Sequence, residues 1–157
     1  MERAPETYYG WGEEDRRQVL ILMLNTQYTG KAMAEAFNGD GKTDILIRDE
    51  DKNVFIGECK FYEGPETVNE TLDQIFGYAT WRDVKLAMIF FIDRVSFTQA
   101  IGRIRETVGA SAQFRAWIAV RGEPESEFRA QMAWPGDEQR LVTMHVSAFH
   151  TPRSVED

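Results

Sequence analysis

The pattern of apolar and polar positions predicts a β-hairpin over Gly41–Phe61. Two short apolar runs, Ile45–Ile47 and Phe55–Ile56, flank the polar stretch Asp49–Asn53. Apolar runs of this length around a polar turn are typical of two antiparallel strands. If the turn is centred on Asp51, each residue of the first strand pairs with the residue at the same distance beyond the turn.

Elsewhere the chain alternates between helical and extended patterns. Helices are expected at Glu13–Gln27, Thr67–Trp81 and Phe97–Val108, and strands around Lys31–Phe37 and at Lys85–Ile92, Gln113–Val120, Glu127–Trp134 and Gln139–Phe149. Lys85–Ile92 is almost wholly apolar, which is typical of a strand buried on both faces. The order indicates an α/β fold with a central mixed β-sheet flanked by helices. At 157 residues, we expect a single domain over residues 1–157.

Two of these helices have a predicted buried face. In the first helix it comprises Val19, Leu20, Met23 and Leu24, and in the second Val68, Leu72, Ile75, Phe76 and Ala79. Gln74 and Tyr78 lie four residues apart in the second helix, so they are neighbours beside its buried face. Alone, an amide and a phenol at such positions are ordinary polar residues on the edge of a helix.

The predicted hairpin register places Asp44 directly opposite Glu58. Side chains so placed have Cβ atoms about 4.5–5.5 Å apart, and like charges there repel. Because strand side chains alternate between faces, Lys60 shares the face of Glu58, while Cys59 points the other way. Two facing carboxylates beside a lysine are a poor structural pair, but they suit a divalent cation. Cys59, the only cysteine, is expected to fill the core, in a reducing compartment.

These motifs together resemble the PD-(D/E)xK nuclease superfamily, which has the restriction-endonuclease-like fold. The chain is most similar to the branch that contains RecB-type and CRISPR-adaptation exonucleases. That branch has a glycine shortly before an aspartate, a carboxylate-x-lysine on the next strand, and Gln-x-x-x-Tyr on the following helix. Here these elements are Gly41…Asp44, Glu58-x-Lys60 and Gln74-x-x-x-Tyr78. The resemblance covers roughly residues 41–92.

The resemblance implies a metal-dependent nuclease acting on DNA, in bacterial restriction, repair or phage defence. The residues do not distinguish DNA from RNA as the substrate. Asp44, Glu58 and the backbone carbonyl of Cys59 would bind Mg²⁺ or Mn²⁺, which prefer oxygen ligands. Lys60 would offset charge on the transition state and help to place the attacking water. Gln74 would orient the water or a phosphate oxygen, and Tyr78 would brace the site or contact the strand.

The chain departs from that branch at two points. One cysteine cannot hold the iron–sulfur cluster that some members carry. The histidine that others place ahead of the aspartate is also missing, because His145 and His150 lie far downstream and are expected to be structural. The resemblance implies that Glu35, or a glutamate of the first helix (Glu13 or Glu14), replaces that ligand.

Net charge is the property that agrees least with nucleic-acid binding. The chain carries −8 at pH 7, whereas affinity for nucleic acids comes largely from phosphate neutralisation by Lys and Arg. We therefore expect another domain or subunit to supply affinity, and a homodimer is one such arrangement. No apolar run is long enough to span a bilayer, and the N-terminus is unlike a secretory signal, so no membrane partner and a cytoplasmic location are expected.

Two alternatives remain open at the level of the sequence. The first is a nuclease-fold module that mediates protein or nucleic-acid interactions and no longer cleaves. Intact Asp44, Glu58 and Lys60 argue against it, and the acidic charge argues for it. The second is a small-molecule-binding α/β protein in which Glu58 and Lys60 form a surface ion pair, which leaves the placement of Asp44 opposite Glu58 unexplained.

Overall fold

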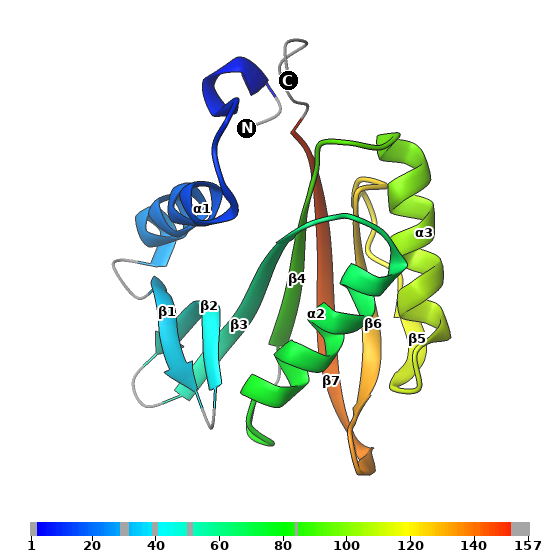
Figure 1. The fold of residues 1–157 in the computed structure, drawn as a ribbon. Helices are drawn as coiled ribbons and strands as arrows, with labels where there is room; N and C mark the ends of the chain where they lie inside the picture. The colour runs from blue at the N-terminus through cyan, green and yellow to red at the C-terminus, as the bar shows by residue number, and fades with distance from the viewer. Residues whose placement is uncertain (1–2, 29–31, 39–40, 50–51, 84, 152–157) are drawn as a thin grey trace.

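The computed structural model describes residues 3–28, 32–38, 41–49, 52–83 and 85–151. Within these ranges, seven strands form one sheet in the order β1-β2-β3-β4-β7-β6-β5. The elements are a short 3-10 helix η1 (Pro5–Tyr8), α1 (Glu13–Tyr28), β1 (Ala32–Asn38), β2 (Gly41–Asp49), β3 (Lys52–Phe61), α2 (Pro65–Tyr78), β4 (Lys85–Ile92), α3 (Phe97–Ala110), β5 (Phe114–Ile118), β6 (Glu127–Trp134) and β7 (Asp137–His150). The predicted α/β class with a mixed sheet is confirmed (Figure 1).

The type of strand pairing changes twice across the width of the sheet. Strands β1, β2 and β3 pair antiparallel, β3 pairs parallel with β4, and β4 pairs parallel with β7. Beyond β7 the pairing with β6 and β5 is antiparallel again. The strand that comes last in the sequence, β7, therefore lies inside the sheet between β4 and β6.

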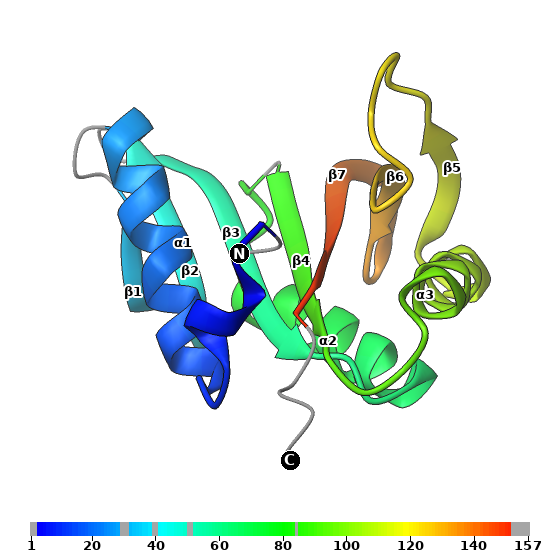
Figure 2. The same cartoon turned by 90° about the horizontal axis from the view of Figure 1, so that it is seen from above.

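Helices cover the two faces of the sheet unequally. Figure 2 shows α1 on one side, over β1–β3, and α2 and α3 on the other. The larger core lies under α2 and α3 and includes Leu46, Ile56, Ile75, Phe90 and Ile104, all fully buried. A smaller core lies under α1. It contains Ile21, Ile45, Ile47, Cys59, Ile89 and Phe91.

Several predicted elements agree with the structure. Lys85–Ile92 and Glu127–Trp134 are strands with the predicted bounds. Every residue of β4 after Lys85 is buried, as expected for an apolar strand covered on both faces. The second helix begins at Pro65 and ends at Tyr78, three residues before the predicted end. It ends there because the backbone is extended at Ala79, and a turn follows in which Asp83 accepts a hydrogen bond from the Thr80 N–H at 2.6 Å.

The predicted inner face of the first helix is partly wrong. Leu20 and Leu24 pack on the smaller core, but Met23 is 53% exposed and Ile21 is buried in its place. The buried side also contains Arg17, one turn before Ile21. A search for an apolar stripe does not place a charged residue on the inner face. The predicted inner face was therefore displaced around the helix axis relative to the observed one.

The helices of this fold are short. None of those in the described ranges has both the length and the apolar character that crossing a bilayer would require.

Candidate active site

The hairpin β2–β3 brings Asp44 and Glu58 together. The pair Ile45↔Gly57 has the predicted register, in which Asp44 stands opposite Glu58. The Asp44 N–H donates to Glu58 Oε1 at 3.2 Å, and the Cys59 N–H donates to Asp44 Oδ2 at 2.9 Å. Each acidic side chain is thus held by a backbone N–H of the other strand.

An irregularity between Ile47 and Arg48 lies between this site and the turn. Beyond it Asp49 pairs with Lys52, so the turn is centred half a residue earlier than predicted. A β-bulge takes up one extra residue in one strand. The predicted register therefore holds at the site, although the predicted turn centre does not.

Burial and a neighbouring charge determine the ionisation of Glu58. Its side chain is 3% exposed. Desolvation by burial, followed by the negative charge of Asp44, raises the pKa of Glu58 to about 8, against an opposing effect of the Lys60 charge. Glu58 is therefore protonated at pH 7. A divalent cation between the two carboxylates would offset their repulsion and so favour the ionised form of Glu58.

Helix α1 contributes a cation that the sequence analysis missed. Arg17 Nη1 lies 2.6 Å from Asp44 Oδ1, and both side chains are largely buried. With Cys59 on the other oxygen, the Asp44 carboxylate is fixed from two sides. Arg17 follows Glu13 by four residues and so shares its helix face, which was the one available signal in the sequence.

Glu13 connects α1 to the end of β3. Its Oε2 accepts a hydrogen bond from the Phe61 N–H at 3.1 Å, and its Oε1 lies 3.7 Å from Lys60 Nζ. Both side chains are 30% exposed, so this ion pair is weak and exchangeable. Of the two helix glutamates considered as ligands, Glu13 reaches the site, whereas Glu14 is exposed.

Asp44, Glu58, Glu13, Arg17 and Lys60 form a carboxylate cluster whose charges influence the buried Cys59 thiol. Burial raises the pKa of this thiol well above its ordinary value, and the charges of Asp44, Glu58 and Glu13 raise it further, against a lowering effect of Arg17. The predicted core position of Cys59 is confirmed. A thiol in these surroundings is not a nucleophile, because the reactive form is the thiolate.

Gln74 and Tyr78 are both half-buried in α2. The Gln74 side-chain carbonyl Oε1 is buried and finds no hydrogen-bond donor among the described residues. Such an oxygen is costly unless water or a ligand satisfies it. The expected roles of these two residues at the site stay predictions.

The predicted metal site can be compared with the side chains that the structure brings together. No group of three or more His, Cys, Asp or Glu side chains within the described ranges is arranged to hold an ion. Two carboxylates do meet, and Mg²⁺ is commonly bound through one or two carboxylates with waters and substrate phosphates. Asp44 and Glu58 fit that mode of binding. The side chain of Glu35, in β1, lies outside the part that the structure describes, so its expected role stays a prediction.

The two histidines lie in the last strand, β7. His145 pairs with Ala87 of β4, and burial, then the Arg129 charge, lowers its pKa. His150 stacks on Phe97 with ring centroids 5.2 Å apart.

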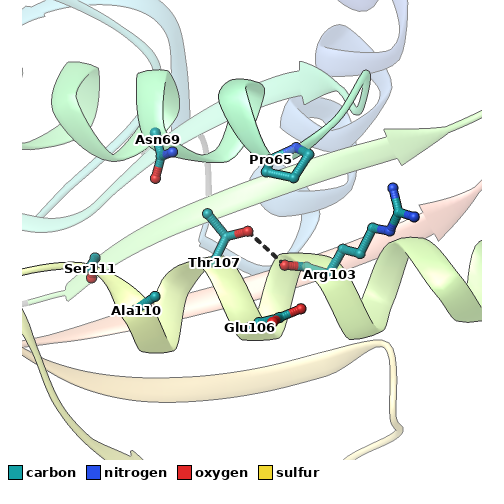
Figure 3. Close-up of a pocket in the computed structure, with 7 residues that line it drawn as sticks. All are labelled: Pro65, Asn69, Arg103, Glu106, Thr107, Ala110 and Ser111. Carbon is teal, nitrogen blue, oxygen red and sulfur yellow. Dashed lines mark hydrogen bonds between the residues drawn. The ribbon is translucent and has the colours of Figure 1, made fainter.

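A separate pocket of about 490 Å³ opens between α2 and α3 (Figure 3). Its lining includes Asn69, Arg103 and Glu106, and Thr107 donates to the Arg103 carbonyl at 2.8 Å. None of the lining residues belongs to the carboxylate cluster.

Comparisons of the chain with protein-family models, with curated proteins and with solved structures give no match.

Proposed function

We propose that this protein is a Mg²⁺- or Mn²⁺-dependent nuclease that hydrolyses DNA phosphodiester bonds on a restriction-endonuclease-like core. The observation that carries the proposal is the cross-strand arrangement of two acidic side chains. Asp44 N–H binds Glu58 at 3.2 Å, and Cys59 N–H binds Asp44 at 2.9 Å. Placing two carboxyl groups together in a buried site is costly unless a proton or a cation offsets their repulsion, as the Glu58 proton and Arg17 do here. A fold that nevertheless holds them there supports a metal-dependent function.

The order of elements supports the same proposal. Helix α1, the three antiparallel strands β1–β3, helix α2 and the parallel strand β4 follow one another in the sequence. This is the order implied by the family resemblance. Asp44 lies on the second strand, Glu58 and Lys60 on the third, and Gln74 and Tyr78 on the following helix.

Asp44 and Glu58, with the Cys59 carbonyl, would hold the ion. When bound, the ion supplies a Lewis acid at the scissile phosphate and lowers the pKa of the attacking water. Glu58 has to lose its proton to become a ligand, because its pKa is raised to about 8. Metal binding near pH 7 is therefore coupled to the release of a proton.

Lys60 and Gln74 act on the phosphate and the water in this proposal. Lys60 exchanges its weak contact with Glu13 for the substrate, where its charge offsets the negative charge of the transition state. The buried Gln74 side-chain carbonyl has no donor among the described residues, and in this proposal it accepts a hydrogen bond from the attacking water. In the hydrolysis itself the water oxygen bonds to phosphorus, the P–O bond to one nucleotide breaks, and the departing oxygen takes up a proton.

Arg17 and Glu13 position the site rather than react. Arg17 fixes the Asp44 carboxylate from the side of α1. Glu13 joins the start of α1 to the Phe61 N–H, beside Lys60. Both contacts form only when α1 packs against β2 and β3, so the site is assembled when this helix docks on the sheet.

The interaction module without cleavage is the second candidate. It is favoured by the Arg17–Asp44 contact of 2.6 Å, because a guanidinium already neutralises one of the two carboxylates. In that case Arg17 would replace the metal ion as the structural counterion, and the domain would serve as a binding surface.

Cleavage assays distinguish the two candidates. Pure protein is incubated with linear, closed circular and single-stranded DNA and with RNA, in EDTA, Mg²⁺ or Mn²⁺. We expect cleavage only with a divalent ion. Asp44→Asn and Lys60→Ala should each lower the rate by at least about 10²–10³-fold, while the exposed Lys85→Ala should cleave like the unaltered protein.

Folding of each variant is checked by circular dichroism, and all proteins are purified in the same way to exclude a contaminating nuclease. Activity that survives in Asp44→Asn would remove the assignment. No metal-dependent product from any substrate would favour the interaction module.

A further inference from the structure

A second pocket adjoins the carboxylate cluster and has an aromatic lining. It has a volume of about 300 Å³ and lies between the N-terminal segment and the carboxyl ends of β3 and β4. Its lining comprises Tyr9, Gly10, Trp11, Gly12, Arg16, Phe61 and Asp93. This volume is at the lower end of the range for small-ligand sites, about 300–1,000 Å³.

The N-terminal segment is held in place by a buried guanidinium. Arg16 Nε donates to the Trp11 carbonyl and Nη2 donates to the Tyr8 carbonyl, each at 3.2 Å. The guanidinium also lies 5.0 Å from the centroid of the Phe61 ring. Arg16 therefore fixes the position of the N-terminal segment. Tyr9 and Trp11 of this segment are not buried in the hydrophobic core.

Two large aromatic side chains remain accessible on this support. Tyr9 is 36% exposed and Trp11 is 37% exposed, and both line the pocket. The Trp11 ring packs nearly perpendicular to the Tyr8 ring, with centroids 5.1 Å apart and an interplanar angle of 76°. A held aromatic face beside an open cavity is suited to stacking with a planar ligand.

The lining contains charges of both signs. The Asp93 side chain is 4% exposed and lies 4.0 Å from Arg94 Nε, and Arg16 donates to two backbone carbonyls. Both charged groups have protein partners, so the aromatic faces are the surface that the pocket offers to a ligand.

The pocket is connected to the cluster through neighbouring residues of the chain and one hydrogen bond. Phe61 lines the pocket and donates its N–H to Glu13, and the next residue back along β3 is Lys60. Gly12 lines the pocket and immediately precedes Glu13. A nucleotide whose phosphate lies at Lys60 would thus bring its own or the adjacent base to the aromatic pocket.

We propose that the pocket formed by Tyr9, Trp11 and Phe61 binds one unpaired nucleobase next to the scissile phosphate by stacking. The inference rests on the proposed nuclease function and adds a site for single-stranded or frayed ends. Stacking of a base on an aromatic side chain is tolerant of sequence.

Fluorescence of 2-aminopurine tests the inference without cleavage. A short single-stranded DNA with one internal 2-aminopurine is titrated with the protein in EDTA at low ionic strength. Stacking on the pocket should quench the fluorescence. Trp11→Leu keeps apolar bulk but removes the ring, and should weaken both quenching and affinity by about tenfold, the order expected for loss of a stacked base. Trp11→Phe should restore most of the binding.

Trp81→Ala is the matched control. Trp81 is also exposed, but it lies after α2, where its indole N–H binds Asp137. This variant should bind like the unaltered protein. Free 2-aminopurine riboside, tested beside the oligonucleotide, should bind much more weakly if the polymer is the ligand. Equal binding of the riboside would assign the pocket to a free nucleoside and overturn the proposal.

An abasic analogue completes the test. The same DNA with an abasic nucleotide at the stacked position should bind the unaltered protein as weakly as the intact DNA binds Trp11→Leu, and should lose no further affinity in that variant. Equal binding of abasic and intact DNA, or no measurable binding, would overturn the base pocket even if cleavage occurs. Stacking without metal-dependent cleavage would instead retain the pocket and remove the nuclease assignment.

Discussion

Glu58 shows how one side chain connects stability, pH and ion binding. It is buried next to Asp44, and its proton is the least costly way to keep both acids in that place. The assumed turn centre predicted its partner Asp44 correctly, because the register shift lies between the site and the turn, and strand alternation predicted the face it shares with Lys60. Its ionisation was beyond the sequence, because it depends on burial that only the tertiary structure produces.

Glu58 should make the metal-free protein less stable as pH rises. Its pKa is 4.5 in the ordinary state and about 8 in the fold. Below pH 4.5 both states are protonated. Above it the unfolded chain releases a proton that the folded chain retains, so the stabilisation from Glu58 is lost as pH rises through about 8. Urea unfolding in EDTA between pH 5 and pH 8 should show a loss on the order of a few kcal/mol.

Glu58→Gln should flatten that profile, because an amide does not titrate. Glu14→Gln, on the exposed side of α1, is the matched control and should leave the profile unchanged. If Glu58→Gln and the unaltered protein had the same dependence on pH, the raised pKa would be wrong.

Proton release on metal binding is a second consequence at the same residue. Adding Mg²⁺ or Mn²⁺ at pH 7 should release close to one proton for each ion bound, because Glu58 ionises when it becomes a ligand. Calorimetry in two buffers of different ionisation enthalpy measures this number. Binding with no proton exchange would exclude Glu58 as a ligand.

At the scale of elements, α1 is attached to the sheet by charged contacts as well as by apolar ones. Arg17 binds Asp44 and Glu13 binds the Phe61 N–H, while Ile21 enters the smaller core. Apolar periodicity predicted that a helix begins at Glu13 and identified Leu20 and Leu24, since these features are local. The partners of Glu13 and Arg17 come from strands 27 to 48 residues away, so no local pattern indicates them.

Arg17→Leu should destabilise the protein by about 3–5 kcal/mol, because it leaves the buried Asp44 carboxylate without its cation. Arg17→Leu combined with Asp44→Asn should recover part of the loss, since the two effects are coupled. Urea unfolding of the single and double variants measures both values.

Divalent ions should change the free energy of unfolding of Arg17→Leu and of the unaltered protein by different amounts. Mg²⁺ should stabilise Arg17→Leu more than the unaltered protein, because the ion takes the place of the guanidinium charge at Asp44. Equal stabilisation of both, or none, would mean that Asp44 does not bind the ion.

At the scale of the whole molecule, charge governs how the domain meets a polyanion. The net charge is −8, and two arginines of α1, Arg16 and Arg17, are buried and bound to protein partners. The composition predicted weak intrinsic binding of nucleic acid. It could not predict that two of the arginines are buried and bind groups of the protein itself.

DNA binding by this chain should therefore depend only weakly on salt. Few phosphates would be neutralised, so log K against log[salt] should have a slope of magnitude about 1–3. Fluorescence anisotropy between about 20 and 200 mM salt measures the slope. A slope near −8, about that of proteins with many phosphate contacts, would reveal a basic surface that the charge distribution does not indicate.

The place of β7 affects how the chain can fold during synthesis. Residues 137–150 insert between β4 and β6, so β4 keeps an apolar, unpaired edge until that segment has left the ribosome. Exposed strand edges invite pairing with other chains, and pairing over long sequence separation is slow. The growing polypeptide thus passes through an interval in which aggregation competes with completion, and a chaperone that shields β4 would raise its yield.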